Sequence, residues 1–534
     1  MVRRAILLIV ALALVAGCLG ERTDAGQSIC GNGVREAGEA CDGSDLGDCI
    51  ACDMDPTINP EQCVCAGYCG DDIIQEPNDD NVTERCDGTD AELCPGECLD
   101  DCSCPGIPVK SSCPILYASD GEGFTFITDM VGNGVVGFPL TPDLTKYHDP
   151  VEWILLPPGL PYEHDGILEL RVVEQLAEIT FLDGIELVAV DHPAGTSAFP
   201  IEGVRMFPPY LPEGIVLADD LRPPVVMTDD AGRDLSSLLT AVDGRYAPVE
   251  TMPYEGFAEP HTLIIDVGDV TGADRVLLFL TGGTRYPQAY STIPAWNDGI
   301  RMVLPTVQVP DSAGGWRTVM ENAPFPAGLP SKTVTLDLTG LIDPADTKVR
   351  ILTGLVAYWD RVVVSTGPPH ASPVITHLSP VKAKLEYRGF PAPLPPKGPF
   401  PQYDYGSDWQ GPDVPSVAGD LTRYGDVLPL MAPGDDMFTV MGPGDEVAVS
   451  FDAGDLPPLA EGSVRTFMVR ADLFFKELYE ESPVYDTVAP LPFHGMSTYP
   501  PPGGESYPSD QRHQDYQAVY NTRPFGALRS TPRG

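Results

Sequence analysis

The sequence predicts a mainly β protein, in which small disulfide-rich repeats precede β-sandwich or jelly-roll-like domains with long loops. Apart from Cys18, all of the 14 cysteines lie between Cys30 and Cys113, so a cysteine-rich module occupies the N-terminal part. The chain contains 54 glycines and 57 prolines, and its apolar runs beyond the N-terminus are short. Long stretches with apolar residues at a period of 3.6 are missing, which favours strands and turns over helices.

Acidic residues dominate the composition. The chain has 78 aspartates and glutamates against 32 lysines and arginines, and its formal net charge is −46 at pH 7. This charge repels phosphate backbones and anionic surfaces, so nucleic-acid binding is excluded. The acidity is compatible with solvation at high salt, with binding of divalent cations or with solubility alone. Solubility is the simplest of these interpretations. With 534 residues, the chain is longer than one domain usually needs.

Residues 1–17 have the pattern of an export signal. Arg3 and Arg4 precede a short apolar core at 5–16, which is too short to span a bilayer comfortably as a helix. The core ends in Leu14-Val15-Ala16-Gly17-Cys18, and this junction resembles the lipobox of bacterial lipoproteins.

The resemblance to lipoproteins implies that Cys18 becomes the lipidated N-terminus, carrying acyl chains such as palmitate. Two or three chains, at about 0.8 kcal/mol per buried methylene group, hold a protein on a membrane. Leu19 stands where an aspartate retains many lipoproteins at the inner membrane, so we expect an outer-membrane or cell-surface location in a Gram-negative host. Residues 18–29 then form a lipid-anchored linker. An ordinary signal peptide with an incidental cysteine is the alternative.

Twelve cysteines form an internal repeat of two sets of six, at 30–66 and 67–105. Each copy begins with Cys-Gly-Asn or Cys-Gly-Asp, continues with Cys-Asp-Gly and a cysteine eight residues later, and closes on Cys-x-Cys. The members are Cys30, Cys41, Cys49, Cys52, Cys63, Cys65, Cys69, Cys86, Cys94, Cys98, Cys102 and Cys104. This pattern resembles the Myxococcus-type cysteine-rich repeat of exported bacterial proteins, whose cysteines are taken to form disulfides.

The length of each repeat supports disulfides independently. An exported segment of about 40 residues cannot bury a sufficient core, and three crosslinks would replace it. Six cysteines allow 15 pairings, so the connectivity stays open. A zinc site at Cys49-x-x-Cys52 and Cys63-x-Cys65 is the alternative, which export to an oxidising compartment disfavours.

The repeats are strongly acidic, with 20 aspartates and glutamates but only two arginines between Cys30 and Cys104. Calcium is the cofactor that such a region would suit, because carboxylates are hard oxygen donors. The candidate ligands are Asp71, Asp72, Asp79, Asp80 and Asp87. They lack the register of an EF-hand loop, and a solvated acidic stalk is the simpler interpretation.

Residues 105–110 predict a linker, after which Cys113 opens the β-rich remainder. As the thirteenth cysteine after two complete sets, Cys113 is expected to be a buried thiol, with pairing to a repeat cysteine as the alternative. We expect a β-rich domain at 113–250, a β-sandwich or jelly-roll-like domain at 251–385, and a proline-rich segment with a C-terminal β-rich region at 386–534.

Short apolar runs separated by turn residues predict the strands. Residues 115–118 and 124–127 alternate apolar side chains around the turn 119–123, which is typical of a hairpin. Further strands are predicted at 167–173, 179–181, 185–190, 262–267, 276–281, 333–338, 349–352, 362–364, 446–451 and 466–475. The proline-rich stretch 390–415 predicts a polyproline segment or a long ordered loop, and 501–534 a loop or frayed tail.

Eight short motifs run through this part of the chain. They are Cys113-Pro114-Ile115-Leu116-Tyr117 with Asp120-Gly121, Val190-Asp191-His192-Pro193, Gly256-Phe257-Ala258-Glu259-Pro260-His261, Gly314-Gly315-Trp316-Arg317-Thr318-Val319, Tyr358-Trp359-Asp360, Tyr387-Arg388-Gly389-Phe390, Arg423-Tyr424-Gly425-Asp426 and Pro492-Phe493-His494-Gly495-Met496. In them the chain resembles an uncharacterised segment that lies C-terminal to FG-GAP, cartilage-acidic-protein-like and tetratricopeptide regions of large exported bacterial proteins. This resemblance implies no established activity.

His192, His261 and His494 lie in these motifs, with Asp191 and Glu259 nearby. A metal site of loop-borne histidines and carboxylates is one interpretation. The three lack His-x-His or His-x-x-x-His spacing, so hydrogen bonds to the backbone are the favoured alternative. No Gly-x-Ser-x-Gly motif predicts a nucleophile, and no catalytic residue is assigned.

A glycan-binding hypothesis rests on Trp316, Trp359 and Asp360. The stretch 309–364 resembles galactose-binding-like jelly rolls, in which exposed aromatic rings stack on sugars and carboxylates bind hydroxyls. Packing of both tryptophans between sheets is the favoured alternative.

The sequence thus predicts an exported lipoprotein with a membrane anchor, a cysteine-rich spacer and a β-rich body. Its expected function is non-catalytic recognition or envelope structure, with a glycan or an envelope protein as partner. One alternative is a carbohydrate-binding module with an aromatic platform. Another is a secreted hydrolase or metal-dependent enzyme with a histidine and carboxylate site.

Thiol counting tests the disulfide interpretation. The mature protein, unfolded without a reductant, is expected to show about one reactive thiol, at Cys113, because the repeat cysteines are paired. A colorimetric thiol assay measures this number. Roughly ten or more reactive thiols would contradict the disulfides and favour metal thiolates.

Overall fold

The computed structural model describes residues 113–525 except 132–134, 137–149, 202–213, 371, 395–397, 410, 413 and 483. It also describes the backbone of two paired strands, β1 (Cys52–Asp53) and β2 (Val64–Cys65). Outside the described residues lie the predicted signal peptide, Cys18, the other repeat cysteines, and the candidate calcium ligands Asp71, Asp72, Asp79, Asp80 and Asp87. Residues 1–105 and 106–534 form two compact units, and all strands from β3 to β28 belong to the second.

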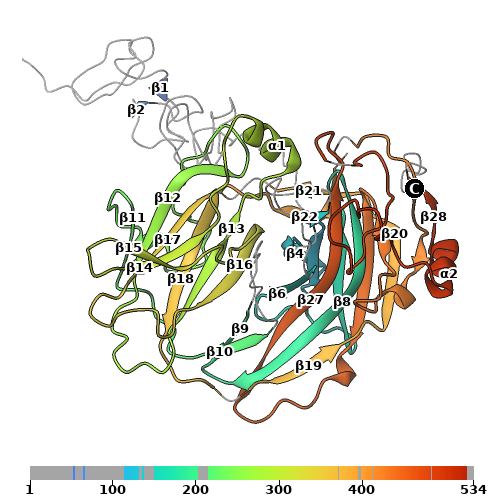
Figure 1. The fold of residues 1–534 in the computed structure, drawn as a ribbon. Helices are drawn as coiled ribbons and strands as arrows, with labels where there is room; N and C mark the ends of the chain where they lie inside the picture. Colours follow the sequence, from blue (N-terminus) through green and yellow to red (C-terminus); the bar gives the residue numbers. More distant parts are fainter. Residues whose placement is uncertain are drawn as a thin grey trace, which may run out of the picture. The chain divides into compact units, whose positions relative to one another are not determined.

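The prediction of a mainly β fold is confirmed, and the second unit contains two sandwiches (Figure 1). The first, here called the split sandwich, combines strands from both ends of the described chain. One of its sheets has the order β19-β8-β27-β5, with β25 on β8 and β6 on β27, and the other has the order β24-β20-β26-β7-β3-β4.

The strands of the split sandwich are β3 (Ile115–Ser119), β4 (Phe124–Asp129), β5 (Val135–Val136), β6 (Val151–Leu155), β7 (Ile167–Val173), β8 (Glu178–Pro193), β19 (Val374–Leu378), β20 (Lys382–Tyr387), β24 (Gly425–Asp426), β25 (Thr439–Met441), β26 (Asp445–Asp452) and β27 (Ser463–Glu477). Alternate residues of these strands point between the two sheets. Leu170, Leu187, Val449 and Val469 are fully buried there, and they belong to the largest apolar core.

The second sandwich, here called the inserted sandwich, lies between β10 and β19 in the chain. Its two sheets have the orders β11-β12-β17-β14-β15 and β16-β13-β18. Its strands are β11 (Val226–Asp229), β12 (Phe257–Asp266), β13 (Leu277–Thr284), β14 (Thr306–Pro310), β15 (Trp316–Met320), β16 (Gly328–Asp337), β17 (Lys348–Leu355) and β18 (Ala357–Ser365). Ile265, Leu278, Val334, Ile351 and Val364 fill the space between these sheets.

Several strands match the sequence predictions. The predicted hairpin forms β3 and β4, which pair antiparallel, and β7 has the predicted bounds. The predicted strands 179–181 and 185–190 are parts of one long strand, β8. Strands of the predicted segments 113–250 and 386–534 pair in the same sheets, as β7 does with β26 and β8 with β27.

The remaining described elements are short. They are the hairpin of β9 (Ser197–Pro200) and β10 (Ile215–Ala218), the pair of β21 (Phe390–Pro393) and β22 (Tyr403–Trp409), the pair of β23 (Asp420–Thr422) and β28 (Asn521–Pro524), the helices α1 (Ala289–Asn297) and α2 (Gln511–Tyr520), and the 3₁₀ helices η1 (Ser236–Leu238), η2 (Leu428–Leu430) and η3 (Ala453–Asp455). The prediction of a loop or frayed tail at 501–534 is wrong for 511–524. There Asp510 caps α2 by accepting from the Arg512 and His513 amides. Among the described residues, no helix has the length and apolar character to cross a membrane.

Buried ion pairs join the two sandwiches. Lys332 on β16 of the inserted sandwich lies 3.0 Å from Asp129 Oδ1 on β4 and 2.7 Å from Glu152 Oε1 on β6. Both carboxylates are almost completely buried. Ile115 and Tyr117 of β3 pack beside them in an apolar cluster with residues of the inserted sandwich. The two sandwiches are therefore fixed to each other by charge pairing as well as by apolar contact.

The substitution Lys332→Met is expected to destabilise the protein by about 3–5 kcal/mol, because it leaves two buried carboxylates without their cation. The matched control is Lys348→Met, whose exposed ion pair with Asp346 should contribute less than about 1 kcal/mol. Guanidinium unfolding monitored by tryptophan fluorescence measures both. Equal, small losses in the two variants would contradict a joining role for Lys332.

Candidate functional site

A β-bulge in the split sandwich positions the candidate site. Strands β8 and β27 pair antiparallel, but the register shifts so that Asp472 faces Gly184 and Leu473 faces Leu182. Asp183 is the extra residue between these pairs. Bulges of this kind turn a side chain out of the regular alternation. Accordingly Leu182 and Ile185, three residues apart, both point into the same core.

A loop packs against the bulge and holds one oxygen of Asp183. The Gly434 amide donates a hydrogen bond to Asp183 Oδ2, as does the Asp435 amide at 3.1 Å. Gly184 permits this approach, because a Cβ at that position would lie 2.7 Å from the backbone nitrogen of Pro433. The glycine and the bulge together bring the loop 433–436 beside β8.

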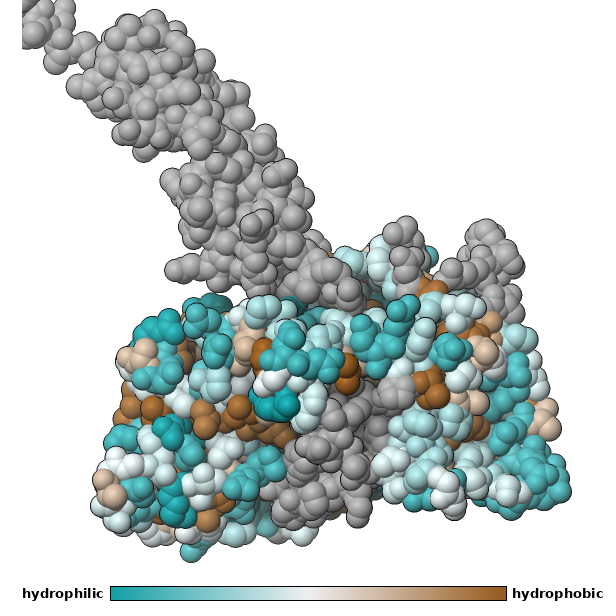
Figure 2. Space-filling model, turned by 45° about the horizontal axis from the view of Figure 1, so that its top comes forward, coloured by the Kyte–Doolittle hydropathy of each residue, from teal (hydrophilic) through white to brown (hydrophobic). Residues whose placement is uncertain are grey.

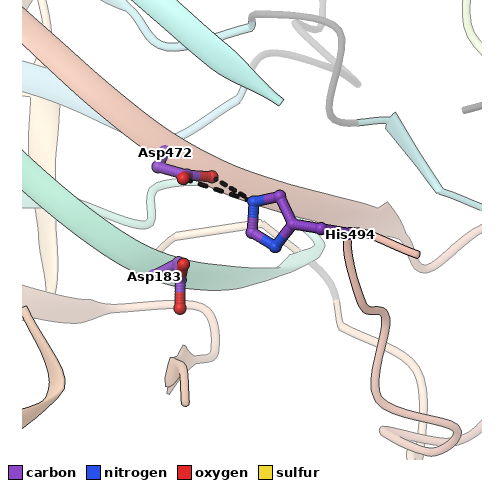
Figure 3. A group of neighbouring side chains, drawn as sticks. All are labelled: Asp183, Asp472 and His494. Carbon is purple, nitrogen blue, oxygen red and sulfur yellow. Dashed lines mark hydrogen bonds and ion pairs between the residues drawn. The ribbon is translucent and has the colours of Figure 1, made fainter. Parts of the chain in front are cut away.

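His494 completes the group from the C-terminal segment (Figure 3). Its Nε2 lies 3.1 and 3.3 Å from the two carboxylate oxygens of Asp472, and its Nδ1 lies 2.7 Å from Asp436 Oδ1. The His494 amide also donates to Asp436 Oδ1, at 2.9 Å. The ring is thus held between a carboxylate of β27 and a carboxylate of the loop.

Within the described residues, Asp183, Asp472 and His494 form one group whose ligand atoms all lie within 4.8 Å of one another. Asp183 and Asp472 are buried, whereas the His494 side chain is 28% exposed. Oδ1 of Asp183 is buried and has no hydrogen-bond partner. Two carboxylates and one imidazole are donors that a divalent metal ion can bind.

Burial and neighbouring charges shift the titration of this group. Burial, and then the charge of Asp472, raise the pKa of Asp183 to about 8. Burial lowers the pKa of His494, but its hydrogen bonds to Asp436 and Asp472 outweigh this effect and raise it to about 10. At neutral pH, the imidazolium ring therefore lies between two carboxylates.

A second group of buried acids lies at the other end of the same strand pairing. Glu178 on β8 faces Glu477 on β27, and both carboxylate oxygens of Glu178 are buried without a hydrogen-bond partner. Burial, and then Glu174 and Glu477, raise the pKa of Glu178. Burial also raises the pKa of Glu477 to about 8. Burial thus favours the neutral form of Glu174, Glu178 and Glu477, and this group offers oxygen donors only.

The predicted glycan-binding residues occupy different environments. Trp359, only 4% exposed, packs in the core of the inserted sandwich, and Asp360 is buried and accepts from the Asp243 and Gly244 amides. Trp316 is half-buried on β15, in the opposite sheet, with the Arg350 guanidinium 4.5 Å from its ring centre. Trp359 and Asp360 therefore have the structural roles of core packing and turn capping.

The histidines singled out in the sequence also differ. His192 lies 2.9 Å from both Thr196 Oγ1 and Thr466 Oγ1, and His261 Nδ1 lies 2.9 Å from the Glu259 carbonyl oxygen. Those contacts are structural hydrogen bonds. Of these three histidines, His494 is the one whose ring the fold places against carboxylates.

Asp183 and Asp472 were not singled out in the sequence, although a local sequence pattern marks each of them. Asp183 and Gly184 interrupt an apolar run, so the sequence predicts two strands, at 179–181 and 185–190, where the structure has the single strand β8. An isolated glycine in such a run is a known indication of a bulge. Asp472 is the acidic residue within an otherwise apolar part of β27. Their proximity depends on strand pairing across nearly 300 residues, which the sequence does not reveal.

Comparison with known protein families, curated proteins and solved structures finds no match to this chain.

The substitution Gly184→Ala is expected to destabilise the protein by about 1–3 kcal/mol, because the new Cβ displaces the backbone of Pro433. Gly503→Ala is the matched control, since that position has open space around it, and its effect should stay within about 0.5 kcal/mol. Urea unfolding measures the two changes. A Gly184→Ala variant as stable as the control would contradict the close approach of the loop to β8.

Proposed function

We propose that the protein is an exported lipoprotein, anchored to the outer membrane or cell surface through Cys18, whose β-rich body has a non-catalytic recognition or envelope-structural function. The observation that carries this proposal is the N-terminal sequence. Two arginines, a short apolar core and Leu14-Val15-Ala16-Gly17-Cys18 together match the pattern of a lipoprotein signal. The acyl chains make the membrane one partner, and a glycan or an envelope protein is the class of the other.

The construction of the body supports a display function. The inserted sandwich is fixed to the split sandwich through Lys332 and the shared apolar clusters, so the body presents its loops from a fixed framework. On the face in Figure 2, hydrophilic residues surround smaller groups of hydrophobic ones. Such a surface suits a body that faces water, with its attachment to the membrane supplied by lipid.

The substitution Cys18→Ser tests the anchor, because serine cannot accept the thioether-linked lipid. The wild-type chain is expected in the membrane fraction and to need detergent for release, whereas the variant appears in the detergent-free soluble fraction. Intact-mass spectrometry should show acyl chains on the wild-type chain alone.

The matched control is Leu19→Ala, which alters the neighbouring residue and leaves the acceptor cysteine in place. It should fractionate with the wild type. A Cys18→Ser variant that still needs detergent for release would overturn the lipid-anchor proposal.

A further inference from the structure

We propose that Asp183, Asp472 and His494 bind a divalent transition-metal ion, of which Zn²⁺ is the representative. This site is independent of the proposed lipid anchor and lies far along the chain from the acidic cysteine-rich repeats. Its three ligands come from β8, from β27 and from the C-terminal segment. Four lines of structural evidence support it.

The distances fit a shared ion. Zinc binds imidazole nitrogen and carboxylate oxygen at about 2.0–2.2 Å, so two ligands in a tetrahedral site lie about 3.4 Å apart. His494 Nε2 already lies 3.1 and 3.3 Å from the oxygens of Asp472. All three donors lie within 4.8 Å of one another, and binding of the ion draws them closer together.

The unpartnered oxygen of Asp183 is an independent indication of a ligand. The Asp183 side chain is completely buried, and its Oδ1 has no hydrogen-bond partner, although Oδ2 accepts from two backbone amides. A buried polar atom without a partner is costly and usually marks a water molecule or an ion. Figure 3 shows one oxygen of Asp183 on the side that faces Asp472 and His494.

The hydrogen bonding of His494 directs Nε2 toward the proposed metal position. Because carboxylates accept hydrogen bonds, the contacts with Asp436 and Asp472 place a hydrogen on each ring nitrogen of the metal-free protein. Zn²⁺ takes the place of the Nε2 hydrogen, which leaves to solvent as a proton, while Nδ1 keeps its hydrogen bond to Asp436. Histidines that bind metals commonly donate their other ring nitrogen to a carboxylate, which orients the ring and increases its basicity.

The donor set selects the class of ion. Calcium takes six to eight oxygen ligands and magnesium keeps an octahedral shell rich in water, whereas imidazole favours zinc and its neighbours in the first transition row. One nitrogen and two carboxylates amount to three protein ligands. Three ligands leave a fourth position of a tetrahedral zinc site for water. The His494 side chain is 28% exposed, so this side of the group faces solvent.

Calorimetry with Zn²⁺ on the full-length Cys18→Ser chain tests the site. After removal of metals with a chelator, this chain is expected to bind one Zn²⁺ through the group, and its melting temperature should rise by several degrees because the ion binds the native state. Ca²⁺ and Mg²⁺ at the same concentrations should leave the melting temperature unchanged. Binding of Ca²⁺ in preference to Zn²⁺ would overturn the assignment of the ion.

Two ligand variants in the same background locate the ion. Asp183→Asn and His494→Gln should each weaken Zn²⁺ binding at this site by at least about 100-fold, and Asp436→Asn by about 10–100-fold. His192→Gln is the matched control, since it removes a buried histidine of β8 that contacts threonines, and it should bind as the parent chain does.

Zinc held by cysteine thiolates of the repeats would be unaffected by these substitutions. Equal Zn²⁺ binding by the parent chain, Asp183→Asn and His494→Gln would therefore overturn the proposal, as would absence of binding by the folded parent chain. His494→Gln changes a partly exposed loop residue. It keeps the test decisive if Asp183→Asn fails to fold.

Discussion

The pairing of β8 with β27 is the interaction on which the rest of the structure depends. These two strands run side by side for 15 residues, from Ser463 to Glu477 of β27. One face of the pair forms the core of the split sandwich. The other face packs against residues of the segment 484–499 at one end and against the β9–β10 hairpin at the other. The bulge at Asp183 lies within this pairing, so the same backbone hydrogen bonds that build the sheet also bring Asp183 to Asp472.

The buried acidic side chains of the body fall into those that pair with a cation and those that do not. Asp129 forms a direct ion pair with Lys332, and Asp445 forms one with Arg523. A buried carboxylate without such a partner is unfavourable unless it is neutral or binds a cation. Glu178 belongs to a group of carboxyls alone and is kept neutral by burial. Burial raises the pKa of Asp183 as well, so the titration of the two groups is similar. What separates them is the His494 imidazole, a nitrogen donor that the group of Asp183 contains and the glutamate group lacks.

Local patterns predicted much of the fold but little of the site. The run at 167–173 alternates in the way that exposed and buried faces require, so β7 was predictable. Strands β3 and β4 do not alternate in burial, but two apolar runs on either side of a glycine-containing turn made their hairpin predictable. The pairing of β7 with β26 and of β8 with β27 joins residues nearly 300 positions apart and depends on tertiary packing. His494 was recognisable as a candidate ligand, but its partners follow from that pairing. Helix α2 was missed because its sequence is polar and depends on the Asp510 cap.

Crystallography of the protein soaked with Zn²⁺ tests the central claim most directly, through an anomalous difference map at the zinc absorption edge. The account predicts a peak at the bulge, about 2.0–2.2 Å from His494 Nε2 and from one oxygen each of Asp183 and Asp472. Asp183 Oδ1 should be the bound oxygen, since Oδ2 already accepts from the loop amides. Zinc peaks confined to the cysteine-rich repeats, with none between β8, β27 and His494, would contradict it.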